Sequence, residues 1–452
     1  MKSARRLISD PVRAACLSFD ILRRARPSPD AAATVRLQTR RLRRTVAYAW
    51  THVPFYKQLF DAAGIRPSDI RSLDDLTKIP VTTRADLQRA PAGDLISDDY
   101  RGRGLLVFKT SGASGLPLSV YQSRWESFVL HVLKLRTLRA LGLRWRDRML
   151  KIHNRYYAHR PPSWKAFQRL GLLRQEVIDP QSPDKVAALL RGKQAEVLMG
   201  YTGFLVRAAQ ILGADTNTSL RPRFLVGGSE TMTPFLRSQI QAGFRAPVRD
   251  TYICQETGIV AWECPASGLY HVLDDSLVVE ILRQGLPCRP GEVGEVVVTG
   301  LIQRAMPFIR YSLGDAVVLS DALCPCGRRS LSFERTLGKM QDFFWLPDGR
   351  EFNPWELAGL WTGRAAWIRQ YELVQEAPDS VVMRIVPSGP PPAEDVAALT
   401  EESRRILGPG VSFRAEFVQD IKPDAGGKFR IHRSAVRSLY NNAVDKEWLS
   451  LP

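Results

Sequence analysis

Between residues 124 and 228, helical segments alternate with short apolar runs that have the character of strands. A long helical stretch covers residues 124–142, and strand-like runs follow at residues 149–152, 197–201 and 224–228. This alternation is typical of α/β domains, in which helices connect strands of a largely parallel sheet. We therefore predict an α/β fold with a substantially parallel sheet in this part of the chain.

The pattern changes at about residue 268, where strands separated by turns, such as residues 277–282 and 294–299, indicate a β-rich subdomain. A further break falls near Gly338 and is followed by a strand-like run and a helical stretch at 393–406, which suit a small α+β domain. A chain of 452 residues is long enough for two to three domains. We predict a large N-terminal domain over residues 1–337 and a small C-terminal domain over residues 338–452.

Residues 109–117, Lys-Thr-Ser-Gly-Ala-Ser-Gly-Leu-Pro, follow an apolar run that we interpret as a strand. Glycines allow backbone N–H groups to turn toward one point, and Thr110, Ser111 and Ser114 add hydroxyl donors. Together with the charge of Lys109, this chemistry suits a polyphosphate. An ordinary hairpin loop explains the same residues, because Ser and Gly are common in turns. The Gly-Lys-Ser/Thr of a P-loop does not follow.

Two stretches further along the chain offer groups that suit a nucleotide. In residues 250–258, Glu256 is a hard oxygen donor of the kind that Mg²⁺ accepts, and Tyr252 has an aromatic face for a base. Upstream, Gly227-Gly228-Ser229-Glu230 has a bare backbone that a purine ring could approach closely. A turn between a strand and a helix is the alternative interpretation of each stretch.

Two later stretches suit the sugar and the reacting groups. Asp315 follows a tight glycine turn, and an aspartate in such a place can accept both hydroxyls of a ribose. In residues 422–430, paired glycines precede Lys428, which suggests a mobile loop that presents one ammonium to a carboxylate beside a phosphate. The alternative for Asp315 is a hairpin turn with a solvated aspartate, and the alternative for residues 422–430 is an ordinary basic turn.

Taken together and in this order, these stretches resemble the adenylate-forming (AMP-binding) superfamily of acyl ligases, and in particular its phenylacetate–CoA ligase-like branch. Residues 52–56, His-Val-Pro-Phe-Tyr, and residues 72–76 support the resemblance, as does the inter-strand turn at 291–295. The most specific match is Pro307-Phe-Ile-Arg-Tyr-Ser-Leu-Gly-Asp315. The resemblance covers roughly residues 40–435.

The resemblance implies that the chain binds ATP through residues of the phosphate loop, the adenine strand-end and the ribose site. These are Thr110, Ser111, Gly112, Ser114 and Gly115; Gly228, Ser229 and Glu230; and Tyr252, Asp315 and Lys339. It also implies that Tyr252 packs on adenine and that Asp315 holds the ribose hydroxyls.

The catalytic roles implied by the resemblance belong to Lys428 and Glu256. Lys428 would bridge the substrate carboxylate and the α-phosphate, which stabilises charge as the carboxylate attacks phosphorus. Glu256 would bind Mg²⁺. Because Lys428 lies beyond a hinge at residues 338–342, the C-terminal domain is expected to be a mobile lid.

Three departures from the family pattern are visible. Ile253 follows Tyr252 where the family usually has glycine, and the hinge reads Gly-Lys-Met-Gln-Asp instead of Gly-Arg-x-Asp-Asp. Lys339 lacks the planar fork of arginine, so its ribose contact is expected to be weaker. Gln341 replaces the usual hinge aspartate. These changes bear more on the second half-reaction of the family, the transfer of the acyl group to an acceptor, than on the first, the formation of the acyl-adenylate.

The acyl pocket is expected near Tyr201, Thr202 and Gly203, with His153 and residues 156–157 as further candidates. Aromatic walls would suit an aryl or flat acid, although the same residues could serve as core packing.

The six cysteines are too few for a disulfide scaffold in a chain of this length. Cys264 and His271 share one turn-rich segment, and Cys324 and Cys326 form a close pair on another. Three thiolates and one imidazole make a closed tetrahedral set for structural zinc. Four unrelated buried residues are the alternative.

The net charge of +18 owes much to the arginines at residues 36–44, which we interpret as a solvated helix face in preference to a docking surface. No motif for nucleic acid is recognised, so none is expected as a partner. No apolar run approaches eighteen residues, so no membrane span is expected. The N-terminus is a poor signal peptide, so we expect a cytoplasmic protein. A homodimer is left open.

The expected function is ATP-dependent activation of a carboxylic acid to an acyl-adenylate, followed by transfer to an acceptor, with CoA as the default. One alternative is an amide-forming ligase that uses an amine acceptor, as relatives in polysaccharide and natural-product pathways would. Another is a non-catalytic nucleotide-binding protein, against which the presence of Glu256, Asp315 and Lys428 argues.

Overall fold

The structure is a computed structural model that describes residues 30–110, 117–152, 168, 171–179, 183–213, 220–361, 367–422 and 428–436. Its first helices are α3 (Ala31–His52) and α4 (Pro54–Ala62), which confirm the helical N-terminal region within the described residues. The buried side of α3 consists of Gln38, Leu42, Val46 and Ala49, and Arg36, Arg40, Arg43 and Arg44 are exposed. Arg41 of the same cluster is partly buried and donates to the carbonyl of Asp275, so four of the five arginines face solvent and the solvated face stays a prediction.

Short elements lead from these helices to the predicted phosphate loop. They are η1 (Pro67–Asp69), η2 (Asp74–Lys78), α5 (Arg84–Arg89), α6 (Ala92–Leu95) and η3 (Asp98–Tyr100). Strands β1 (Leu106–Lys109) and β2 (Ser119–Gln122) then pair antiparallel on either side of the loop. Ser111, Gly112, Ser114 and Gly115 lie outside the described residues.

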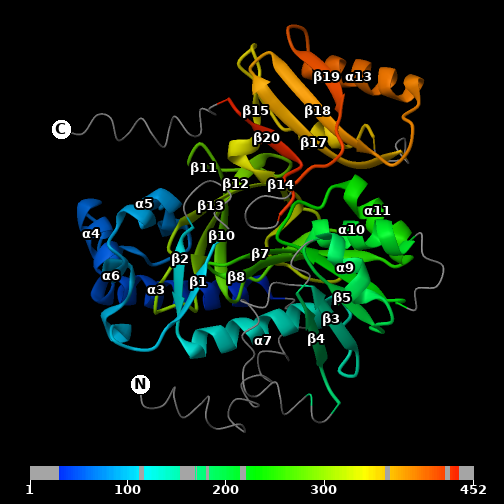
Figure 1. Cartoon of the computed structure of the whole chain (residues 1–452). Helices are drawn as coiled ribbons and strands as arrows, with labels where there is room; N and C mark the ends of the chain where they lie inside the picture. Colours follow the sequence, from blue (N-terminus) through cyan, green and yellow to red (C-terminus); the bar gives the residue numbers. More distant parts are fainter. Residues whose placement is uncertain are drawn as a thin grey trace.

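One half of the main sheet is parallel, as predicted. Its strands are, in spatial order, β4 (Arg174–Ile178), β3 (Arg148–Ile152), β5 (Val197–Met199), β6 (Phe224–Gly228) and β7 (Val248–Cys254). Alternate residues face opposite layers: Met149 packs with helix α7 (Arg124–Ala140), whereas Leu150 packs with the helices of the other layer. That other layer consists of α9 (Pro183–Leu190), α10 (Thr202–Gly213) and α11 (Pro234–Phe244) (Figure 1).

The strands of the predicted β-rich region extend this same sheet. From β7 outward they are β8 (Gly258–Glu263), β9 (Tyr270–Val272), β14 (Ser332–Lys339), β13 (Tyr311–Ser320), β12 (Val293–Gly300), β10 (Leu277–Arg283) and β11 (Leu286–Pro287). All of these neighbours pair antiparallel. The result is a mixed sheet of twelve strands, so the β-rich part is a continuation of the α/β sheet.

The C-terminal part, at the top of Figure 1, has its own sheet, and its apolar core also includes Phe235 of α11. Its elements are η5 (Met340–Asp342), β15 (Phe344–Trp345), β16 (Glu351–Phe352), α12 (Trp355–Ala358), β17 (Ile368–Ala377), β18 (Ser380–Pro387), α13 (Ala393–Leu407), β19 (Ser412–Phe417) and β20 (His432–Ser434). Four of these strands form a sheet in the order β19-β18-β17-β20. Because β14 ends at Lys339 in the main sheet, we propose the division near residue 338 with a hinge at η5. Among the described helices, none has the length and apolarity needed to cross a membrane.

Candidate active site

The predicted acyl pocket and the predicted adenine strand-end meet at the carboxyl ends of β5 and β6, which are neighbours in the parallel sheet. Tyr201 and the start of α10 follow β5, and Ser229 and Glu230 follow β6. A Cβ atom on Gly228 would lie 2.7 Å from Thr251 Oγ1, so glycine allows β6 to run close beside β7. Ligands of open α/β sheets bind at such strand ends, which places these residues in a suitable location.

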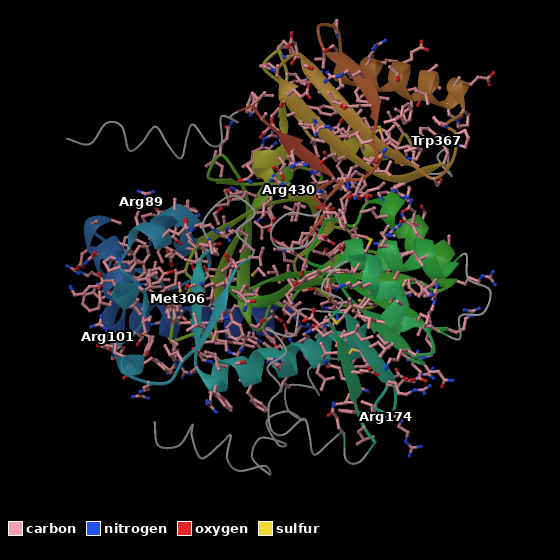
Figure 2. All side chains as sticks on the ribbon, in the orientation of Figure 1. Arg89, Arg101, Arg174, Met306, Trp367 and Arg430 are labelled. Atoms are coloured by element: carbon pink, nitrogen blue, oxygen red, sulfur yellow. The ribbon has the colours of Figure 1, made fainter. Side chains whose placement is uncertain are left out.

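Lys428 lies beside the predicted acyl pocket. Its Nζ is 6.0 Å from the centre of the Tyr201 ring, and the backbone N–H of Phe429 donates to Glu230 Oε1 at 2.8 Å. Arg430 forms an ion pair with Asp342 of the proposed hinge, and Figure 2 shows Arg430 where the C-terminal part meets the main sheet. The C-terminal part therefore brings the predicted catalytic lysine to the strand ends of the larger part.

Three residues assigned to the nucleotide lie in direct contact. The Tyr252 hydroxyl donates to Asp315 Oδ2 at 2.7 Å, and Lys339 Nζ lies 2.8 Å from Asp315 Oδ1. The antiparallel register of β13 and β14 places Asp315 opposite Lys339. Burial and the charge of Asp315 raise the pKa of Tyr252 well above its usual range, so the hydroxyl remains a donor. Lys339 thus contacts the Asp315 carboxylate, although its ammonium lacks the planar fork of an arginine side chain.

The predicted magnesium ligand, Glu256, is connected to Thr110, the first residue of the predicted phosphate loop, through the side chains of Tyr311 and Arg84. Glu256 is buried, and its Oε1 accepts a hydrogen bond from the Tyr311 hydroxyl at 3.3 Å. Thr110 Oγ1 accepts from Arg84 Nη2 at 2.8 Å. Burial and the charge of Glu256 raise the pKa of Tyr311, and the neighbouring Arg84 opposes this rise. Arg84 was not predicted from the sequence, where its only signal is its place directly after the helix cap Thr83.

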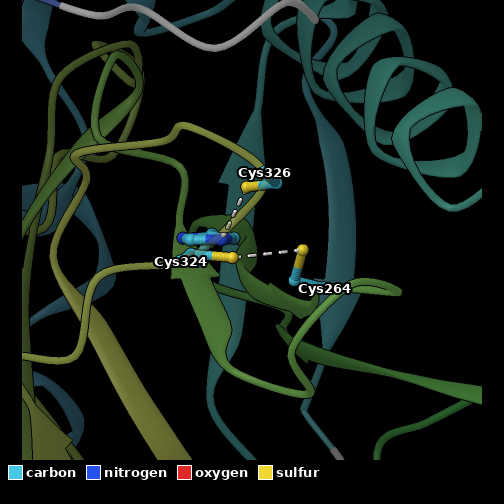
Figure 3. A group of neighbouring side chains, drawn as sticks. Cys264, Cys324 and Cys326 are labelled. Carbon is cyan, nitrogen blue, oxygen red and sulfur yellow. Dashed lines mark hydrogen bonds between the residues drawn. The ribbon is translucent and has the colours of Figure 1, made fainter.

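The structure also brings the four predicted zinc ligands together, as Figure 3 shows for the three cysteines. All four ligand atoms lie within 4.8 Å of one another. Cys324 Sγ is 3.6 Å from Cys264 Sγ, and Cys326 Sγ is 3.3 Å from His271 Nε2. The four residues are therefore neighbours in space, and the zinc site stays a prediction.

The protonation state of the His271 imidazole suits a metal ligand. Burial, with the charge of Arg328, lowers the pKa of His271 to about 4, so the imidazole is neutral near pH 7. Ser330 Oγ lies 3.2 Å from Nδ1 on the other side of the ring. A partner on one ring nitrogen orients the other toward a metal, as is usual around metal-binding histidines.

The remaining acyl-pocket residues are only partly described. Thr202 is fully buried, and its Oγ1 has no hydrogen-bond partner among the described residues. Tyr201 stacks on Phe204, with ring centres 5.9 Å apart. His153, Tyr156 and Tyr157 lie outside the described residues.

Comparison with known proteins identifies the family. No protein-family model matches the chain. The phenylacetate–coenzyme A ligase of Escherichia coli is 30% identical over 325 residues, which cover 68% of this chain and 71% of that protein. The chain belongs to the phenylacetate–CoA ligase family. The phenylacetate–coenzyme A ligase of Thermus thermophilus is 29% identical over 318 residues, or 68% of this chain and 70% of that protein. The predicted resemblance is confirmed, and the chain is an adenylate-forming ligase.

Solved structures confirm the fold. The 2-hydroxyisobutyryl-CoA ligase in its postadenylation state matches with a TM-score of 0.75 at 20% identity, over 94% of each chain. The same enzyme in its thioesterification state matches with a TM-score of 0.61 at 21% identity, again over 94% of each chain.

Proposed function

We propose that the protein activates a carboxylic acid with ATP and transfers the acyl group to the thiol of CoA. The observation that supports this most directly is the position of Lys428 beside Tyr201, because a cation that serves adenylate formation must reach the acid. The family membership and the contacts among Tyr252, Asp315 and Lys339 agree with it.

In the first step, a carboxylate oxygen of the acid attacks the α-phosphorus of ATP, and the bond from that phosphorus to the pyrophosphate oxygen breaks. The products are the acyl-adenylate and pyrophosphate. The Lys428 ammonium stabilises the negative charge shared by the attacking carboxylate and the α-phosphate. Glu256 is the residue that would hold Mg²⁺, which neutralises phosphate charge when bound.

In the second step, the sulfur of CoA attacks the acyl carbonyl carbon and the thiol proton passes to solvent. The bond from the acyl carbon to the phosphate oxygen of AMP then breaks, which leaves the thioester and AMP. The Lys428 segment lies on the side of Tyr201 in the present arrangement, so it has to move away before an acceptor enters from that side.

We propose an aryl or other flat acid as the substrate class. The partly buried ring of Tyr201, which stacks on the buried Phe204, provides aromatic surface near Lys428. Stacking on such surfaces favours planar groups. The relatives named above act on phenylacetate, which belongs to the same class of acids.

We also propose that Cys264, His271, Cys324 and Cys326 hold one structural zinc ion. Bonds of about 2.3 Å to sulfur and about 2.1 Å to nitrogen in a tetrahedron separate the ligand atoms by about 3.5–3.8 Å. Two of the six separations, 3.6 Å and 3.3 Å, lie close to these values, and all six are within 4.8 Å. Four protein ligands leave no open position for substrate, so the role is structural.

The function is tested by measuring pyrophosphate release over a panel of carboxylic acids with MgATP. Each accepted acid is then tested with CoA and with amino acids as acceptors. We expect an aryl acid to give the highest rate and CoA to give a thioester. Transfer to amines alone would support the amide-forming alternative, and no pyrophosphate release with any acid would contradict the proposal.

Asp315→Ala is expected to weaken AMP binding about five- to 150-fold. The reason is that ribose hydroxyls would lose their acceptor, and an unpaired polar group costs about 1–3 kcal/mol. Calorimetry with AMP measures the effect, and Asp321→Ala is the matched control because Asp321 is exposed near the end of the same strand. Equal AMP affinity in wild type and Asp315→Ala would rule out this placement of the ribose.

A further inference from the structure

The carboxylate of Glu230 joins two segments that belong to different parts of the molecule. Its Oε2 accepts the backbone N–H of Gly203 at 2.5 Å, and its Oε1 accepts the backbone N–H of Phe429 at 2.8 Å. Gly203 is in the first turn of α10, beside the proposed acyl pocket. Phe429 directly follows Lys428. One side chain therefore connects the acyl-pocket helix to the lysine segment.

The local backbone is shaped for this contact. Ser229 has φ +68°, a left-handed conformation that is uncommon for a residue other than glycine, and it directs the chain into Glu230. On the opposite side, a Cβ atom on Gly203 would lie 2.3 Å from Phe429 Cδ2. The absence of a side chain at residue 203 is thus what allows Phe429 to lie against α10.

The electrostatics favour a carboxylate at this point. Hydrogen bonds from N–H groups to an ionised carboxylate are stronger than those to neutral acceptors. The start of α10 carries partial positive charge from its peptide dipoles, which favours the negative side chain. A movement of the C-terminal part away from the larger part would break the Phe429 contact and leave the Gly203 contact in place.

Other contacts between the two parts lie farther along α10 and α11. Gln210 Nε2 donates to the carbonyl of Arg369 at 2.6 Å, and Gln239 Nε2 donates to the carbonyl of Ile368 at 3.0 Å. These bonds hold β17, whereas Glu230 holds the residue next to Lys428. The Glu230 contact is thus the one of these three that fixes the position of the lysine itself.

We propose that Glu230 is a positioning residue that clamps the Lys428 segment onto α10 for adenylate formation and releases it for acyl transfer. This inference rests on the proposed function. It gives the Glu230 carboxylate a task distinct from the adenine contact that the sequence suggested for this strand-end.

The main test compares Glu230→Ala and Glu230→Gln in the two half-reactions. We expect pyrophosphate release to fall about ten- to 100-fold in Glu230→Ala, because both charge-assisted bonds are lost. Glu230→Gln keeps one acceptor oxygen and should lose less. Transfer from a pre-made acyl-adenylate to CoA should stay within about twofold of wild type in both variants.

Two further variants make the test specific. Gly203→Ala should reproduce the selective loss in the first half-reaction, because its Cβ atom would displace Phe429. Glu376→Ala is the control, since Glu376 is exposed on the C-terminal part and pairs with Arg414. It should leave both half-reactions unchanged. Equal losses in both half-reactions for Glu230→Ala, or no loss in either, would overturn the proposal.

A second measurement does not depend on turnover. In ligand-free protein, trypsin should cleave after Lys428 or Arg430 faster in Glu230→Ala and Glu230→Gln than in wild type, because the segment is released more often. Cleavage elsewhere should keep its wild-type rate. Equal cleavage rates at these two residues would overturn the proposal even if wild type accepted no acid, whereas absence of turnover in wild type alone would contradict the proposed function.

Discussion

Lys428→Ala is expected to reduce pyrophosphate release from acid and MgATP by about 100- to 1,000-fold. Charge stabilisation by a single well-placed group has an effect of this size in other enzymes. In the described structure, Lys428 Nζ lies 6.0 Å from the centre of the Tyr201 ring, on the side where the acid is proposed to bind. Alanine removes this cation from the side of Tyr201.

The same substitution should largely spare the second half-reaction. Once the acyl-adenylate exists, the attacking thiol needs the space that the lysine segment occupies, so the lysine has no task in that step. A pre-made acyl-adenylate with CoA should therefore give thioester at a rate within a few-fold of wild type. Stopped-flow or quenched-flow assays of the two half-reactions measure this difference directly.

Lys422→Ala is the matched control, because Lys422 is an exposed lysine of the same C-terminal part, six positions before Lys428. It should leave both half-reactions unchanged. If Lys428→Ala slowed both half-reactions equally, or left pyrophosphate release intact, Lys428 would not have the role proposed for it.

Local sequence patterns predicted the elements better than their assembly. Apolar runs at 149–152, 197–201 and 224–228 predicted strands because buried parallel strands are nearly continuous apolar runs, and each contains a strand, although the second ends at Met199. The joining of the later strands to the same sheet was not predicted. It depends on pairs such as Phe333 with Tyr270, which are distant in sequence and leave no periodic signal in either segment.

In the candidate site too, residues in short motifs could be predicted, whereas contacts between distant segments could not. The clustering of Cys264, His271, Cys324 and Cys326 could be predicted because cysteine and histidine have a narrow chemistry and the short spacing of Cys324 and Cys326 is itself informative. The link from Arg84 to Thr110 could not, because arginine is common on surfaces and its partner is fixed only by the fold. The contacts of Glu230 were missed for the same reason, since both of its partners are backbone amides that any residue possesses.

Protein purified without chelator is expected to contain about one zinc ion per chain, and Cys324→Ser is expected to lose it. Loss of a structural metal is among the few single changes that can cost about 4–5 kcal/mol or more. Cys324 and Cys326 lie in the connection between β13 and β14, whereas Cys264 and His271 belong to the β8–β9 segment. Removing one ligand should therefore loosen two connections of the main sheet at once.

The measurements are elemental analysis and urea unfolding followed by intrinsic fluorescence. Cys288→Ser is the matched control, because Cys288 is a partly buried cysteine outside the proposed zinc set. It should keep the zinc and most of the free energy of unfolding. In Cys324→Ser, activity should fall only as far as the folded fraction falls, since a closed four-ligand site offers no position to substrate. A wild-type protein free of zinc, or a Cys324→Ser variant as stable as Cys288→Ser, would show that the four residues hold no structural metal.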